Sequence, residues 1–163
     1  MDILNVAKKR VLDACCGSRM FWFNRENPEA VFCDIREEDT TLCDGRKLTV
    51  KPDVICDFTN LPFADNTFWH VIFDPPHVMC GENSWTAKKY GTLKNTDWEK
   101  MIHDGFYECL RVLKPNGTLI FKWSEVDIPV SKVLDVIGKE PLYGHRVGKL
   151  NKTHWMAYLK DEQ

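Results

Sequence analysis

The sequence lacks several patterns that identify common protein classes. None of its seven cysteines forms a Cys-x-x-Cys pair, so we expect neither a zinc ribbon nor a thioredoxin-like redox motif, and we predict no metal site. The pattern Gly-x-Gly-x-x-Gly is also absent, which disfavours a dinucleotide-dependent dehydrogenase. No apolar run is long enough to cross a membrane, so we expect no membrane partner.

The chain also has little excess charge of either sign. Its formal net charge is -2 and its isoelectric point is near 6.2, which argues against a strongly basic nucleic-acid binder but allows a local basic patch. An odd number of cysteines without a secretory signal favours a reducing, cytoplasmic setting. The length of 163 residues fits one domain, which we place at 1–163.

Four short apolar runs dominate the first half of the chain, and each leads to an aspartate: Asp13, Asp34, Asp57 and Asp74. Such runs are typical of buried strands in a parallel sheet. Acids often end strands without any further role. Four at successive strand ends would, however, place their carboxylates along one edge of the sheet, where they repel one another. A ligand with hydroxyls, an amine or a positive centre would relieve that repulsion.

The fourth run is followed by Asp74-Pro75-Pro76-His77. The two prolines cannot donate to a sheet ladder, so they end the strand and stiffen the chain beyond it. In open α/β sheets, ligands bind at the carboxyl ends of strands. Asp74 could therefore face a ligand, or it could only cap the backbone at a turn.

The second half of the chain predicts a loop, two helices and three strands. Residues 78–95 are polar and rich in loop-forming residues, which favours a mobile lid over the strand ends. A helix is predicted to follow, with Thr96 as its N-cap and Glu99 completing a capping box. The other predicted elements are a strand at 118–123, a helix at 129–136, and an antiparallel pair of strands at 142–147 and 154–159.

Three motifs resemble those of the class I S-adenosylmethionine-dependent methyltransferases. Residues 12–18 (Leu-Asp-Ala-Cys-Cys-Gly-Ser) are similar to the first motif of that family, although its second glycine is absent. Residues 57–68 resemble its Asp-x-x-x-Leu-Pro-Phe-x-Asp-x-x-Phe segment, and residues 110–117 resemble its Leu-Arg-Val-Leu-Lys-Pro-Gly-Gly turn. The resemblance implies a Rossmann-like α/β fold: a mostly parallel seven-stranded sheet with an antiparallel C-terminal strand and helices on both faces.

The resemblance also implies S-adenosyl-L-methionine as the cofactor and assigns residues to it. Asp34, with Ile35 beside it, would accept from the ribose hydroxyls, and Asp57 and Phe58 would lie beside the adenine. The turn formed by the first motif would pass close to the methionine part of the cofactor. The residues of that turn with an implied contact are Asp13, Ala14, Cys15, Gly17 and Ser18.

Asp74-Pro75-Pro76-His77 further resembles the acid-Pro-Pro-aromatic motif of amino-methyltransferases, particularly those acting on adenine N6, with His77 in place of the usual Tyr, Trp or Phe. In that interpretation Asp74 and the carbonyl of Pro75 accept from the target amine. Pro76 keeps the segment rigid, and His77 stacks on the base. The target would be adenine in DNA or RNA, with nucleic acid as the partner.

Two other interpretations remain open. The same motif is compatible with N-methylation of a protein glutamine or a small amine. The chain could also be an inactive cofactor-binding subunit that supports a catalytic partner. Lys88, Lys89 and Lys94 are consistent with phosphate contacts, but equally with a solvated loop.

Overall fold

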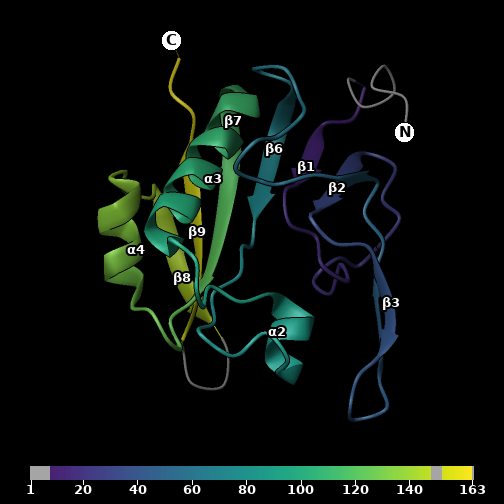
Figure 1. Cartoon of the computed structure of the whole chain (residues 1–163). Coiled ribbons are helices and arrows are strands. Elements are labelled where there is room, and N and C mark those ends of the chain that lie inside the picture. Colours follow the sequence, from purple (N-terminus) through teal and green to yellow (C-terminus); the bar gives the residue numbers. More distant parts are fainter. Residues whose placement is uncertain (1–7, 148–151, 163) are drawn as a thin grey trace.

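The computed structural model describes residues 8–147 and 152–162, and a seven-stranded sheet forms its centre (Figure 1). The strand order is β5-β2-β1-β6-β7-β9-β8. β9 runs antiparallel to β7 and β8, whereas the pairs among β5, β2, β1, β6 and β7 are parallel. This arrangement confirms the predicted fold class. The strands are β1 (Val11–Asp13), β2 (Ala30–Asp34), β5 (Val54–Ile55), β6 (Phe68–Phe73), β7 (Leu113–Ser124), β8 (Tyr143–Val147) and β9 (Thr153–Leu159).

The strand order reverses its direction at β1. The chain proceeds from β1 to β2 and β5 on one side, and then returns to place β6 on the other side of β1. Such a reversal opens a crevice at the carboxyl ends of the strands, where ligands bind in folds of this kind. β1 and β2 end on Asp13 and Asp34, β6 ends one residue before Asp74, and β5 ends two residues before Asp57. The predicted acids therefore follow neighbouring strands.

Two helices cover one face of the sheet (Figure 1). The longer helix, α3 (Trp98–Val112), packs against β6 and β7, and α4 (Val130–Ile137) packs against α3. Alternate strand residues such as Val71 and Phe121 point into this interface, because side chains alternate between the faces of a sheet. The N-cap of α3 is Asp97, whose side chain accepts from the Lys100 N–H, rather than the predicted Thr96.

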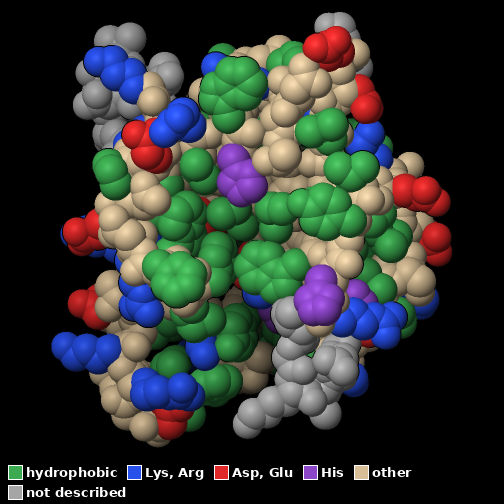
Figure 2. All heavy atoms as spheres, turned by 180° about the vertical axis from the view of Figure 1, so that it is seen from behind, with side chains coloured by type: hydrophobic (Ala, Val, Ile, Leu, Met, Phe, Trp, Pro, Cys, Tyr) green, Lys and Arg blue, Asp and Glu red, His purple; other side chains and the backbone are tan. Residues whose placement is uncertain are grey.

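The face of the sheet opposite α3 and α4 is partly covered by a segment of turns. Ile72, Ile120 and Trp155 lie there, and Figure 2 shows hydrophobic side chains gathered over the middle of this face. Phe21, from a segment of turns after β1, packs edge-on against Trp155. Helices were predicted on both faces, but in the described parts of the chain α3 and α4 share a single face.

The chain segment between β2 and β5 forms a β-hairpin that was not predicted from the sequence. β3 (Glu38–Thr41) pairs with β4 (Lys47–Val50), and Gly45 adopts a left-handed φ of 81° in the turn between them. The signals were present in the sequence: an Asp-Gly dipeptide, and an alternation of polar and apolar residues in Lys47-Leu48-Thr49-Val50. The predicted turn at 114–117 is also part of a strand, since β7 begins at Leu113.

We expect Gly105→Ala to destabilise the fold. A Cβ at this position of α3 would lie 2.5 Å from the ring of Phe58 and 2.9 Å from that of Phe73. Overpacking costs about 1–3 kcal/mol, while the gain in helix propensity is only about 0.5–1 kcal/mol. Urea unfolding should show a lower midpoint. Gly81→Ala, which has open space around its Cβ, is the matched control. Equal midpoints for the two variants would contradict this packing.

Candidate active site

A cavity of about 470 Å³ lies at the carboxyl ends of the parallel strands. It brings together all of the predicted site residues except Asp13 and Ala14. The predicted residues that line it are Cys15, Gly17, Ser18, Asp34, Ile35, Asp57, Phe58, Asp74, Pro75, Pro76 and His77. Segments far apart in sequence therefore meet around one space.

The Asp34 carboxylate holds the turn that follows β1. Its Oδ2 accepts from the Gly17 N–H at 2.9 Å. Its Oδ1 accepts from the backbone N–H of Arg36 at 3.0 Å and from the Arg36 Nε at 3.2 Å. Gly17 has a φ of 49°, a left-handed conformation that favours glycine. A carboxylate has about four lone-pair sites, so Asp34 keeps acceptor capacity for a ligand.

Asp57 and Phe58 lie at the end of the cavity beside β5. Asp57 is exposed, and its Oδ1 accepts from the backbone N–H and the hydroxyl of Thr59, both at 2.8 Å. The Phe58 ring packs edge-on against Phe73, with centroids 5.2 Å apart. This contact and the close approach of Gly105 hold the ring in place beside the cavity.

Asp13 lies behind the cavity wall rather than on it. The side chain is fully buried, and its Oδ2 accepts from the Trp22 Nε1 at 2.7 Å. Its Oδ1 has no hydrogen-bond partner in the described part of the chain. Burial, together with the negative charges of Asp74 and Asp34, raises the pKa of Asp13 to about 7. Asp13 therefore anchors the segment after β1 from below, and neither it nor the buried Ala14 lines the cavity.

Asp74 forms an ion pair that the sequence analysis missed. Its Oδ2 lies 2.5 Å from the Nζ of Lys122 on the neighbouring strand β7, and both side chains are largely buried. Lys122 was assigned only to a strand. The available signal was a lysine within the apolar run at 118–123. The cavity wall also contains residues that were not assigned to the site: Cys16, Met20, Phe21, Arg36, Lys89, Tyr90, Gly91, Thr92 and Met101.

His77 is held by its own motif. Its Nδ1 lies 3.3 Å from the carbonyl oxygen of Pro75, an arrangement in which the Nδ1–H donates to that carbonyl. Burial lowers the pKa of His77, and the nearby Lys122 lowers it further, whereas Asp74 opposes the shift. The ring is therefore neutral at pH 7, with Nε2 as an acceptor. Its neighbours are Tyr90 at 5.8 Å and Trp123 at 6.2 Å between ring centroids.

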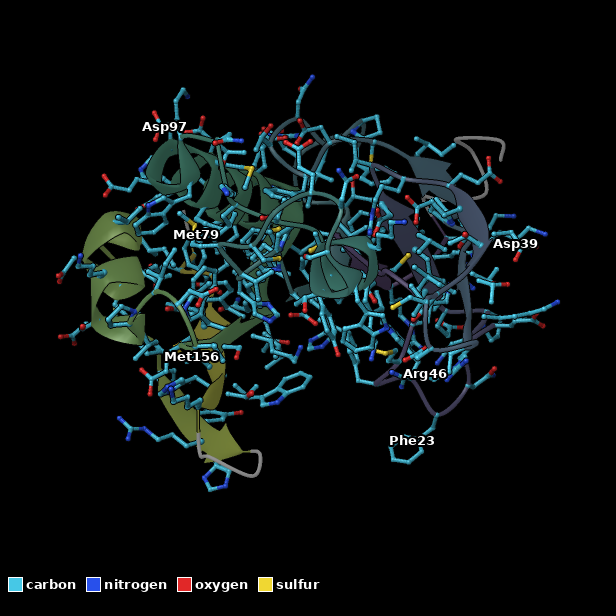
Figure 3. All side chains as sticks on the ribbon, turned by 60° about the horizontal axis from the view of Figure 1, so that its bottom comes forward. Phe23, Asp39, Arg46, Met79, Asp97 and Met156 are labelled. Carbon is cyan, nitrogen blue, oxygen red and sulfur yellow. The ribbon has the colours of Figure 1, made fainter. Side chains whose placement is uncertain are left out.

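The predicted lid at 78–95 contains a short helix, α2 (Trp85–Tyr90), whereas the sequence analysis predicted an irregular loop. Ser84 caps the helix by accepting from the Ala87 N–H at 3.1 Å. Trp85 packs against a buried cluster of the hairpin formed by Leu42, Leu48 and Val50. Figure 3 shows α2 in the middle of the molecule when the lower end of Figure 1 is turned forward. Mobility of this segment stays a prediction.

No group of three or more His, Cys, Asp or Glu side chains is arranged to hold a metal ion in the part of the chain that the structure describes. Within the same residues, every helix is too short or too polar to cross a membrane.

The buried Asp13 should make stability depend on pH. Because the pKa of Asp13 is raised when folded, its protonated form favours the fold. That contribution is full below the ordinary pKa of 3.8 and is lost as the pH rises toward about 7. Asp13→Asn keeps an acceptor for Trp22 without the charge. It should match the wild type at acid pH and exceed its free energy of unfolding at about pH 8, by on the order of 4 kcal/mol. A difference that does not vary with pH would contradict this interpretation.

Comparison with solved structures places the fold among known proteins. The chain superposes on the PH0226 protein of Pyrococcus horikoshii OT3 with a TM-score of 0.59 and 21% identity, over 94% of this chain and 84% of that one. The N-methyltransferase NodS of Bradyrhizobium japonicum WM9 gives a TM-score of 0.58 and 9% identity, over 98% and 93%.

A third similar structure was solved with ligands. It is the 1,6-didemethyltoxoflavin-N1-methyltransferase of Burkholderia thailandensis, with bound 1,6-didemethyltoxoflavin and S-adenosylhomocysteine. Its TM-score is 0.52 and its identity 13%, over 99% of this chain and 80% of that one. No family model matches the sequence, and no curated protein matches it. Together with the strand order, these likenesses show that the chain has the fold of the class I methyltransferases.

Proposed function

We propose that this chain is an S-adenosyl-L-methionine-dependent N-methyltransferase whose target is the exocyclic N6 amine of adenine in DNA or RNA. One observation carries the proposal: Asp34 and the Asp74-Pro75-Pro76-His77 motif line the same cavity. Acceptors suited to a ribose and acceptors suited to an amine therefore share one space. Methyl transfer requires both reactants to be held together in that way.

The residues of the cavity fit the proposed cofactor. S-adenosylmethionine carries a sulfonium-activated methyl group, ribose hydroxyls and an adenine. Asp34 retains acceptor sites for the hydroxyls, and Asp57 has its Oδ2 free of the contacts that Oδ1 makes to Thr59. Phe58 offers an apolar surface for an adenine ring. The carboxylates also favour a ligand with a positive centre.

The target amine would lie against Asp74 and Pro75. An exocyclic amine on an aromatic ring is a weak nucleophile, because its lone pair is shared with the ring. Acceptors on its hydrogens favour the pyramidal, positively charged nitrogen of the transition state. The nitrogen lone pair then forms the bond to the methyl carbon, and the carbon–sulfur pair returns to sulfur. We assign the proton that leaves nitrogen to Asp74, from which it passes to water.

The proline-rich motif supplies rigidity for this step. Pro75 is buried, and the Pro76 ring lies so close to Gly91 that a Cβ on Gly91 would approach it to 2.8 Å. The Pro75 carbonyl accepts from His77 and retains a second lone pair for the amine. These acceptors are thus fixed before the substrate enters, which avoids reorganisation during the reaction.

Two observations favour the alternative functions. The 1,6-didemethyltoxoflavin-N1-methyltransferase has a similar fold and was solved with a bound small molecule, which supports a small amine as target. The ion pair between Asp74 and Lys122 occupies one oxygen of the proposed acceptor, which supports the inactive cofactor-binding subunit. As for nucleic acid, Lys88 and Lys94 are exposed on the lid, whereas Lys89 lies over the rings of Trp85 and Tyr90.

A labelling experiment separates these functions. The protein is incubated with methyl-labelled S-adenosylmethionine and, in parallel, with single-stranded DNA, RNA, a protein mixture and free nucleosides. Digestion and chromatography then identify the methylated product. N6-methyladenine supports the proposal, and a labelled glutamine or small amine supports the second function. Cofactor binding without any product supports the inactive subunit.

We expect Asp74→Ala to lower kcat about a hundredfold or more while cofactor affinity changes little. The lost acceptor acts mainly in the transition state, and single transition-state hydrogen bonds contribute about that much. Single-turnover kinetics and calorimetry measure the two quantities. Asp135→Ala, an exposed carboxylate on α4, is the matched control. A folded Asp74→Ala protein with wild-type kcat would remove Asp74 from the chemistry.

Asp34→Ala should have the opposite signature. Loss of charge-assisted hydrogen bonds to the ribose is expected to weaken cofactor binding by about 1–3 kcal/mol. Because Asp34 also binds Gly17 and Arg36, thermal unfolding must be followed in the same samples. Unchanged calorimetric affinity in a folded variant would refute the assignment of Asp34.

A further inference from the structure

The position of Lys122 follows directly from the register of two strands. β6 and β7 run parallel, and Phe73 is the register partner of Phe121. The residues that follow them, Asp74 just beyond the end of β6 and Lys122 within β7, therefore project on the same side of the sheet at its carboxyl edge. The two side chains meet at 2.5 Å between Lys122 Nζ and Asp74 Oδ2, and both line the cavity.

Methyl transfer by itself does not explain a lysine at this place. The proposed cofactor carries a positive charge, and the attacking nitrogen becomes positive in the transition state. A cation beside that nitrogen opposes the charge that develops there. Neutralising Asp74 would also weaken the acceptor that the reaction uses. The position of this lysine therefore points to a role in binding the substrate.

The ion pair presents a donor and an acceptor side by side. The Lys122 ammonium group has hydrogen-bond donors and no acceptor. The ionised Asp74 carboxylate has acceptors and no donor. Paired donor and acceptor groups recognise the edge of a base by two simultaneous hydrogen bonds, as the amide of Asn or Gln does with adenine. In adenine the N6 amine and the ring nitrogen N1 are bonded to the same carbon. Their spacing is therefore similar to that of Nζ and Oδ2 in the ion pair.

We infer that Lys122 is a specificity-determining residue that donates to the ring nitrogen beside the target amine, while Asp74 accepts from the amine itself. This inference rests on the proposed function and narrows its substrate. The site requires an amine conjugated to a neighbouring acceptor atom, as in N6 and N1 of adenine. It rejects alkyl amines and aromatic amines that lack such an atom, because Lys122 would then remain buried without its second partner.

The test compares adenine with its deaza analogues. Short single-stranded oligonucleotides carry one adenine, 1-deazaadenine or 7-deazaadenine, and kcat/KM is measured for each. The wild type should prefer adenine over 1-deazaadenine but not over 7-deazaadenine, and Lys122→Met should reduce the first preference about tenfold. Because the preference is a ratio measured on one protein sample, a partly unfolded variant does not change it. The intrinsic reactivity of each base also cancels between the variants.

Two further variants separate hydrogen bonding from structure. Lys122→Gln keeps a donor and should retain most of the preference, whereas a role limited to neutralising Asp74 would make it behave like Lys122→Met. Lys132→Met, an exposed lysine on α4, should match the wild type. A preference against 1-deazaadenine that Lys122→Met removes supports the contact to N1, whereas a preference that Lys122→Met removes only against 7-deazaadenine overturns it.

The outcomes also distinguish this inference from the proposed function. Binding of adenosine and both deaza analogues is measured calorimetrically with S-adenosylhomocysteine present, so that a readout exists without turnover. If adenine is methylated but Lys122→Met leaves every ratio unchanged, the inference fails and the proposed function stands. If the wild type neither binds adenosine nor methylates adenine, both fail.

Discussion

The pairing of β1 with two parallel neighbours is the constraint on which the site depends. β1 has only three residues, yet it forms hydrogen bonds with β2 on one side and β6 on the other. Because all three strands run in one direction, Asp34 and Asp74 emerge at the same edge of the sheet, with the turn after β1 between them. The cavity is the space that this edge leaves open.

The charges along this edge are balanced by partners from other elements. Asp34 is compensated by Arg36 and by a backbone N–H, and Asp74 is compensated by Lys122. Among the described residues Asp13 has no cationic partner, and it accepts a hydrogen bond from Trp22 instead. Its burial therefore raises its pKa to about 7. The predicted row of four carboxylates thus divides into three on the cavity wall and one beneath it. The three carboxylates on the wall are therefore placed to contact a ligand, whereas Asp13 supports the turn after β1.

Several local features were predictable because neighbouring residues along the chain specify them. Apolar runs leading to acids predicted β1, β2 and β6, and the capping-box pattern of Thr96 and Glu99 predicted a helix where α3 lies. The hairpin of β3 and β4 had a readable turn in Asp44-Gly45 but was missed, since an exposed two-stranded ribbon contains few apolar residues. The helix α2 was missed because its six residues derive support from Trp85 packing on that hairpin, a contact distant in sequence.

The sequence by itself determined the strands of the central sheet, the acids at their ends and the rigid segment Asp74-Pro75-Pro76-His77. Each of these depends on hydrophobic patterning or on the conformational limits of proline. Only the tertiary structure decided which acids reach the cavity and which cation meets Asp74. Asp13 and Asp34 look alike in sequence, but one is enclosed by Trp22 and the other faces the cavity. Lys122 lies 48 residues from Asp74, and only the register of β6 against β7 brings them together.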